Sequence, residues 1–201
     1  MAGTSQYFEP DPDVASRPRT VDLVLPDMTL HLRTDRGVFS AANVDPGTKL
    51  LLLEGASPPV GTRDLLDLGC GYGPIALALA RRAPEATVWA VDVNRRALAL
   101  CAANADANGL KNVRTVEPDD IPDDVRFAGI WSNPPIRIGK TALHELLLRW
   151  LTRLDAGAHA WLVVQKHLGS DSLAKWLTEQ GWDATRRVSR SGYRLLEVGR
   201  P

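Results

Sequence analysis

The sequence predicts an α/β fold: a doubly wound, mostly parallel sheet of seven strands, closed by a C-terminal antiparallel pair and preceded by a small β-hairpin. Short apolar runs alternate with helical patterns through most of the chain, as they do where helices cover both faces of a parallel sheet. A glycine-rich turn joins the first of these strands to the first of these helices. The last two strands follow one another with no helix between them, which predicts antiparallel pairing.

The segment ahead of the glycine-rich turn is expected to be an appendage. Three prolines lie among acidic and small residues within positions 1–20, which indicates an extended arm. The elements that follow are a hairpin over residues 20–32, a loop over 34–43 and a short helix over 48–54. We therefore assign residues 1–56 to an arm, hairpin and helix packed on a main domain of residues 57–201.

Apolar runs and their boundary residues give the strands and helices of the main domain. Strands are expected at residues 65–68, 87–93, 113–116, 127–132, 160–165, 182–188 and 193–198. Helices are expected at residues 75–80, 94–108, 141–154 and 172–180. Pro74 opens the first of these helices, where its missing N–H costs nothing, and Asn94 caps the second.

The composition is that of one globular domain. The 201 residues are 44% hydrophobic and 24% charged, enough apolar side chains for a sizeable core. No apolar run approaches the ~20 residues that span a bilayer, and the N-terminus lacks a signal-peptide pattern. Only Cys70 and Cys101 occur, so we expect no disulfide framework and a cytoplasmic protein. The four histidines lack metal-ligand spacing, and no metal is expected.

The net charge is zero but unevenly distributed. Residues 1–135 hold 13 Lys and Arg against 18 Asp and Glu, a balance of −5, and residues 136–201 hold 11 against 6, a balance of +5. Basic residues of the second part include Lys166, His167, Arg186, Arg187, Arg190 and Arg194. This split permits contact with a polyanion, and it is equally compatible with solvated faces of helices and strands.

Gly69, Gly71 and Gly73 alternate in the turn after the strand at residues 65–68. Their spacing is Gly-x-Gly-x-Gly, whereas a dinucleotide fold has Gly-x-Gly-x-x-Gly. Glycines at this place let a ligand lie against bare backbone at a helix N-terminus. Asp67 precedes the turn, where its charge repels a phosphate but can order the loop and accept from an ammonium. The turn therefore favours a ligand that carries a positive charge.

Asp92 lies at the end of the next strand, at residues 87–93. An acidic side chain at this place can accept hydrogen bonds from both hydroxyls of a ribose. Enzymes that use NAD share this feature with enzymes that use S-adenosylmethionine, so it indicates a nucleoside rather than a reaction. A buried Asp that caps the following helix is the alternative.

A third feature, Asn133-Pro134-Pro135-Ile136, follows the strand that ends at Ser132. Two consecutive prolines fix two φ angles and force Asn133 to be extended, which makes a rigid corner. The Asn133 side-chain oxygen and the Pro134 carbonyl can both accept from one NH₂ group. An exocyclic amine is a poor nucleophile because its lone pair is delocalised, and two acceptors favour the pyramidal nitrogen that attacks. After a glycine turn and a ribose carboxylate, this corner predicts a site for an amine.

These motifs together resemble class I S-adenosylmethionine-dependent methyltransferases. The flanking segments TDRGVFS, VDPGTKLLL, NPPIRIGK, LVVQKHLGS and SGYRLLEV resemble the methyltransferase small domain family, from about Tyr7 to Val198. That family includes small-subunit ribosomal RNA guanine-N2 methyltransferases, some of which carry a second, duplicated domain. The resemblance implies a Rossmann-like methyltransferase sheet that binds S-adenosyl-L-methionine at residues 57–201, in a short, single-domain branch.

The resemblance assigns roles to residues near the strand ends. The cofactor-binding set is Asp67, Gly69, Cys70, Gly71, Asp92, Val93, Asp119, Asp120 and Asn133. The glycine turn and Asp67 would line the methionine end, Asp92 would hold the ribose hydroxyls, and Val93 would lie against the adenine. Asp119 would accept from adenine N6, and the Asp120 N–H would meet N1. The catalytic set, which presents the target amine to the sulfonium methyl, is Asn133, Pro134, Pro135 and Ile136.

One departure from the family pattern concerns the target base. Many amine methyltransferases place Tyr or Phe after Asn-Pro-Pro, whereas Ile136 lacks the aromatic stacking worth ~1–3 kcal/mol per base. The aromatic candidates to replace it are Phe39, Tyr7, Phe8 and Tyr193. The candidates to meet phosphates beside a flipped nucleotide are Arg137, Lys140 and Lys166.

The leading hypothesis is methyl transfer to an exocyclic amine of RNA, at guanine N2 of 16S (small-subunit) ribosomal RNA, with RNA or a ribosomal subunit as partner and no membrane. A methyltransferase for a small metabolite or a protein amide would share the same features. A non-catalytic RNA- or nucleotide-binding module is the third hypothesis, disfavoured by intact Asp67, Asp92 and Asn133. An NAD oxidoreductase is disfavoured by the glycine spacing.

Overall fold

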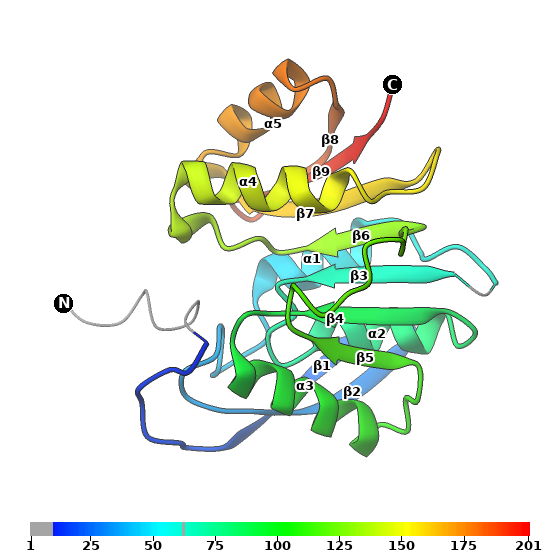
Figure 1. Ribbon diagram of the computed structural model, residues 1–201. Helices are drawn as coiled ribbons and strands as arrows, with labels where there is room; N and C mark the ends of the chain where they lie inside the picture. Colours follow the sequence, from blue (N-terminus) through cyan, green and yellow to red (C-terminus); the bar gives the residue numbers. More distant parts are fainter. Residues whose placement is uncertain (1–9, 62) are drawn as a thin grey trace.

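The computed structural model describes residues 10–61 and 63–201 and confirms the predicted α/β class. Its main sheet has the strand order β5-β4-β3-β6-β7-β9-β8, in which β9 pairs antiparallel with both neighbours and the other pairs are parallel. The strands are β3 (Asp64–Leu68), β4 (Thr87–Val91), β5 (Val113–Val116), β6 (Gly129–Ser132), β7 (His159–Gln165), β8 (Asp183–Arg190) and β9 (Tyr193–Gly199). The predicted hairpin forms a separate sheet of β1 (Arg19–Leu25) and β2 (Met28–Thr34) (Figure 1).

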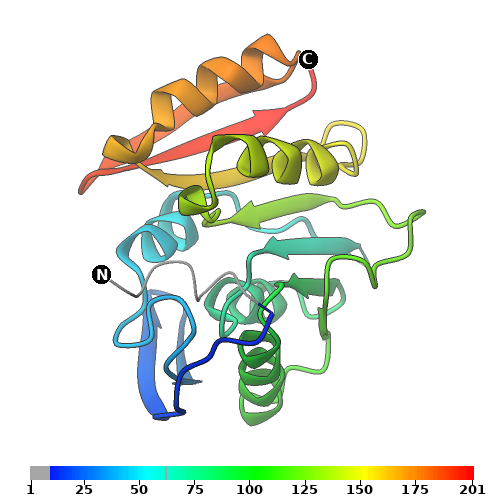
Figure 2. The same cartoon turned by 60° about the vertical axis from the view of Figure 1, so that its left-hand side comes forward.

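Helices cover both faces of the main sheet. They are α1 (Pro46–Glu54), α2 (Pro74–Arg82), α3 (Arg95–Ala107), α4 (Lys140–Leu151) and α5 (Ser170–Glu179). Strand side chains alternate between two buried clusters: Leu65 packs with α1, α2, α3 and the hairpin, whereas Leu66 packs with α4 and α5. Both views show α4 and α5 near β7 and β9 and the hairpin toward the opposite end of the main sheet, where β2 contacts α3 (Figure 2). None of the described helices is long and apolar enough to cross a membrane.

Several boundaries differ from those expected from the sequence. Helix α1 begins at Pro46, two residues before the expected start, because the Asp45 side chain accepts a hydrogen bond from the Thr48 N–H (3.1 Å) and caps the helix there. Strand β6 begins at Gly129, since Phe127 forms only an isolated bridge with Leu154.

The register of the three central strands sets the position of the site. Leu68 of β3 lies opposite Val91 of β4 on one side and opposite Ser132 of β6 on the other. The residues that follow these three strand ends, including the glycine turn, Asp92 and Asn133, therefore meet at one edge of the sheet, where α/β folds bind ligands.

Candidate active site

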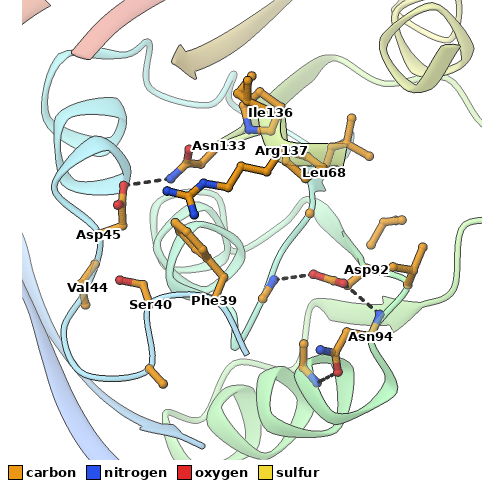
Figure 3. A pocket seen from close by; sticks show the side chains of 18 of the residues that line it. Phe39, Ser40, Val44, Asp45, Leu68, Asp92, Asn94, Asn133, Ile136 and Arg137 are labelled. Carbon is orange, nitrogen blue, oxygen red and sulfur yellow. Dashed lines mark hydrogen bonds between the residues drawn. The ribbon is translucent and has the colours of Figure 1, made fainter. Parts of the chain in front are cut away.

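A cavity of about 730 Å³ opens at the carboxyl ends of β3, β4 and β6 (Figure 3). Its volume is within the usual range for small-molecule sites. The residues named from the sequence that line it are Phe39, Gly69, Gly71, Asp92, Val93, Asn133, Pro134, Pro135, Ile136 and Arg137. Asn133 and Asp92 lie on opposite sides of the cavity in Figure 3.

The glycine turn forms the floor between these two residues. Gly69 and Gly71 have φ angles of +78° and +55°, and a Cβ atom added at either would meet nothing within 4 Å. A side chain there would project into the cavity and strain the backbone, so glycine keeps the floor open to a ligand. The Gly69 and Cys70 N–H groups donate to the Val91 carbonyl (2.8 and 2.9 Å), which ties the turn to β4.

Asp92 is held in place by backbone groups on both sides. One carboxylate oxygen accepts from the Gly71 N–H and the other from the Asn94 N–H, each at 2.9 Å. Burial raises the pKa of Asp92, and these backbone hydrogen bonds oppose that rise. Each carboxylate oxygen retains a further lone pair, so the side chain can accept from two hydroxyl groups in the cavity.

Asp67 is not among the residues that line the cavity, and its expected place near the methionine end of the cofactor stays a prediction. It is fully buried beneath the turn, and its Oδ2 accepts from the Ala76 N–H of α2 (2.8 Å). Its Oδ1 has no hydrogen-bond partner among the described residues. Asp67 therefore orders the turn from below, and burial raises its pKa to about 8.

This raised pKa predicts a pH dependence of stability. In the native state Asp67 keeps its proton up to about pH 8. In the unfolded chain, where its pKa has the ordinary value of 3.8, it releases that proton above about pH 4. The free energy of unfolding therefore loses up to about 1.4 kcal/mol per pH unit from this group as pH rises from about 4 to about 8. In urea titrations, Asp67→Asn should flatten that decline, and an equal slope for variant and wild type would contradict the assignment.

Asp119 and Asp120 are not among the residues that line the cavity, so the adenine contacts expected of them stay a prediction. The Asp119 side chain is 89% exposed and pairs with Arg149 of α4 (2.8 Å). Pro118 lines the cavity in their place, because the chain after β5 turns there before either acidic residue is reached. Cys70 is buried with its thiol donating to the Gly71 carbonyl (3.5 Å), and it borders only a small adjoining pocket.

The Asn-Pro-Pro corner has a defined backbone shape. Pro135 has φ −75° and ψ 72°, and the Pro134 carbonyl accepts from the Ile136 N–H (2.8 Å), the geometry of an inverse γ-turn. This bond uses one of the two lone pairs of the Pro134 oxygen and leaves the other for a ligand. The Asn133 amide nitrogen donates to Asp45 Oδ1 (2.9 Å) and Thr48 Oγ1 (3.2 Å).

A loop of residues 37–45, here called the Phe39 loop, forms one wall of the cavity. Asn94 donates to the Gly37 carbonyl (2.7 Å) at one end of the loop, and Asp45 holds Asn133 at the other. Ser40 has a φ of +56°, uncommon outside glycine, and its hydroxyl donates to the Asn43 carbonyl (2.6 Å). The turn places Phe39, 43% exposed, against the cavity.

Other residues proposed from the sequence lie elsewhere. Lys140 and Lys166 are exposed and do not line the cavity, and Tyr193 uses its hydroxyl in hydrogen bonds with Asp45 and Gln165. Three arginines of the expected basic patch are paired with carboxylates: Arg187 with Glu197, Arg190 with Glu54 and the buried Arg194 with Asp171. Tyr7 and Phe8 lie outside the described residues.

The sequence reading missed several residues that complete the site. Asp45 and Thr48 bind Asn133, and Gln165 and Leu168 line the far wall. The pattern Asp45-Pro46 before an apolar run signals a helix cap, and nothing in it signals a contact with Asn133.

A family model described as the methyltransferase small domain matches residues 29–197. This chain belongs to the methyltransferase small domain family. The resemblance inferred from its motifs is thereby confirmed, and the class of reaction expected of the cavity is methyl transfer.

Relatives of this methyltransferase fall into two groups by length. YbxB of Bacillus subtilis (strain 168) is 34% identical over 198 residues, covering 97% of this chain and 98% of YbxB. Ribosomal RNA small subunit methyltransferase C of Shewanella halifaxensis (strain HAW-EB4) is 37% identical, covering 69% of this chain and 41% of that protein. The solved structure of the T. thermophilus 16S rRNA N2 G1207 methyltransferase RsmC, in complex with AdoMet and guanosine, matches with a TM-score of 0.80 at 26% identity. The match covers 94% of this chain and 52% of that protein. The chain thus spans about half or less of the named rRNA methyltransferases.

Proposed function

We propose that this protein is an S-adenosylmethionine-dependent N-methyltransferase that modifies guanine N2 of 16S (small-subunit) ribosomal RNA. The observation that carries the proposal is the orientation of Asn133, whose amide nitrogen is bound by Asp45 and Thr48. This leaves Oδ1 as an acceptor at a cavity that Asp92 lines from the other side. The relatives named small-subunit rRNA methyltransferase support RNA as the substrate.

The residues of the cavity fit S-adenosyl-L-methionine, which supplies a methyl group on a positively charged sulfur. The open floor at Gly69 and Gly71 would receive the methionine end, and Asp92 would accept from the ribose hydroxyls. Tyr72 borders the adjoining small pocket, and its hydroxyl is buried without a hydrogen-bond partner among the described residues. Burial raises the pKa of Tyr72, so it stays protonated and can donate to a polar group of the ligand.

The corner would prepare the target amine for attack. Asn133 Oδ1 and the free lone pair of the Pro134 carbonyl accept the two amine hydrogens, which withdraws the nitrogen lone pair from the ring and directs it toward the methyl carbon. Since both acceptors are fixed before substrate binds, the protein does not reorganise at the moment of reaction. Methylation would leave a positive charge on the nitrogen and make its N–H acidic, so the surplus proton can pass to water and no strong general base is required at the corner.

Phe39 and Arg137 are the residues that would hold the target base. Both line the cavity, and Figure 3 shows them on the same side as Asn133. Phe39, in the Phe39 loop, offers an aromatic ring on which the target base could stack. It would take the place of the aromatic residue that many amine methyltransferases have at the position of Ile136. Arg137 carries a charge suited to a phosphate beside a flipped nucleotide.

The test is transfer of labelled methyl from S-adenosylmethionine to naked 16S rRNA and to isolated small subunits, followed by nucleoside analysis. We expect N2-methylguanosine as the product. Methyl transfer should be abolished when the RNA is first digested with ribonuclease, and it should be reduced at high salt because phosphate contacts weaken with salt. Transfer that survives ribonuclease would indicate a metabolite or protein amide as substrate. Calorimetric binding of S-adenosylmethionine without any product would favour a non-catalytic module.

A further inference from the structure

Asp45 connects three elements that are far apart in the sequence. Its Oδ1 caps α1 by accepting from the Thr48 N–H (3.1 Å) and also accepts from Asn133 Nδ2 (2.9 Å), 88 residues away. Its Oδ2 accepts from the Tyr193 hydroxyl (3.2 Å), which in turn accepts from Gln165 Nε2 (3.0 Å). The Asp45 side chain is nearly buried, at 8% exposure.

The chemistry of a carboxylate determines which way the Asn133 amide faces. An ionised carboxylate only accepts hydrogen bonds, so the amide must turn its NH₂ group toward Asp45. Thr48 Oγ1 also accepts from this nitrogen (3.2 Å), although a hydroxyl can donate as well and only the carboxylate fixes the direction. The Asn133 oxygen is then directed away from Asp45, and no hydrogen bond uses it among the described residues.

The carboxylate itself is held from behind. Gln165 and Tyr193 are paired residues at the ends of β7 and β9, so the sheet positions the hydroxyl that binds Asp45. Gly47 permits this contact: a Cβ atom there would lie 2.5 Å from Tyr193 Cε1 and 2.9 Å from Asp45 Oδ1. The ring therefore packs against the first turn of α1 only because residue 47 is glycine.

We propose that Asp45 is a positioning residue that sets the hydrogen-bond polarity of the Asn133 corner, through the chain Gln165, Tyr193, Asp45 and Asn133. A reversed amide would present hydrogen-bond donors to the target amine and repel it. Asp45 therefore makes the corner accept from an amine, an inference that rests on the proposed N-methyl transfer. The segment that carries Asp45, ahead of the main sheet in the sequence, thereby takes part in the reaction.

Three variants of Asp45 separate this role from helix capping. Asp45→Ser keeps a good cap for α1 but is one bond too short to reach Asn133. Asp45→Ala removes the helix cap and the hydrogen bonds with Asn133 and Tyr193, whereas Asp45→Asn keeps an oxygen that can accept from both Thr48 and Asn133. We expect kcat to fall about 10²-fold in Asp45→Ser and Asp45→Ala, with most of the activity recovered in Asp45→Asn and the Kd for S-adenosylmethionine little changed.

The amide of Asn133 gives a readout that needs no substrate. In ¹⁵N spectra, the side-chain NH₂ pair of Asn133, identified by its loss in Asn133→Ala, should shift and exchange faster in Asp45→Ser and Asp45→Ala but not in Asp45→Asn. An unchanged NH₂ pair in Asp45→Ser, or a kcat restored by serine, would overturn the inference and leave only a capping role. If the wild-type protein methylates no RNA, the proposed function fails and the spectra alone decide the role of Asp45.

Discussion

Replacing Asn133 by alanine is expected to reduce kcat for methyl transfer by about 10²–10³-fold, the cost of removing one fixed polar group from a transition state. The substitution deletes the side-chain acceptor and leaves only the Pro134 carbonyl for the target amine. Asp45 still accepts from Thr48 and Tyr193, so no buried carboxylate loses all its partners and the fold should persist. The measurement is single-turnover transfer to 16S rRNA, with S-adenosylmethionine affinity determined by calorimetry.

Ser132→Ala is the matched control for Asn133→Ala. Ser132 precedes Asn133 and donates to the Leu68 carbonyl (2.6 Å), but it does not line the cavity. Its loss removes a buried hydrogen bond one residue from the corner, so stability should fall by about 1 kcal/mol while kcat stays near that of the wild type. Equal losses of kcat in both variants would show that activity falls because the local structure is destabilised, and would contradict a direct role of Asn133 in binding the target amine.

The positions of Gly69, Asp92 and Asn133 were predictable because each lies directly after a strand whose apolar run is plain in the sequence. Parallel strands bring their carboxyl ends to one edge, so three local patterns suffice to place these residues together. The fold class was predictable from the same alternation of strands and helices, which is a local pattern and does not depend on tertiary contacts.

The role of Asp45 was not predictable, because its partners are set by tertiary packing. An Asp before Pro and an apolar run is a helix-cap pattern, and Asp45 does cap α1, although the predicted helix began at residue 48. Its contacts with Asn133 and Tyr193 join positions 88 and 148 residues apart, and no local pattern encodes them.

For two acidic positions, the sequence did not determine which way the side chain points, for different physical reasons. A carboxylate before a glycine turn can face a ligand or fold beneath the next helix, and Asp67 does the second because it accepts from Ala76. Asp119 is drawn outward by Arg149 of α4, a partner that the sequence near the third parallel strand does not indicate. Charge and spacing identified the residue types but left the direction of each side chain undetermined.

Replacing Asp92 by alanine is expected to weaken S-adenosylmethionine binding by about 10²–10⁴-fold, since a charged acceptor for two ribose hydroxyls is lost at roughly 1.5–3 kcal/mol per hydrogen bond. Asp92→Asn should lose less, because one amide oxygen still accepts. Calorimetry of the purified protein measures both Kd values directly.

Asp119→Ala is the control that tests whether Asp119 contacts the adenine, as predicted from the sequence, or lies outside the site, as in the structure. The structure places this carboxylate on Arg149, 89% exposed and outside the cavity wall, so its Kd for S-adenosylmethionine should match that of the wild type. A large loss in Asp119→Ala would instead mean that the segment after β5 rearranges to contact the adenine. An unchanged Kd in Asp92→Ala would show that the nucleoside does not bind at this end of the cavity. The proposed alignment of the sulfonium methyl toward Asn133 would then be wrong as well.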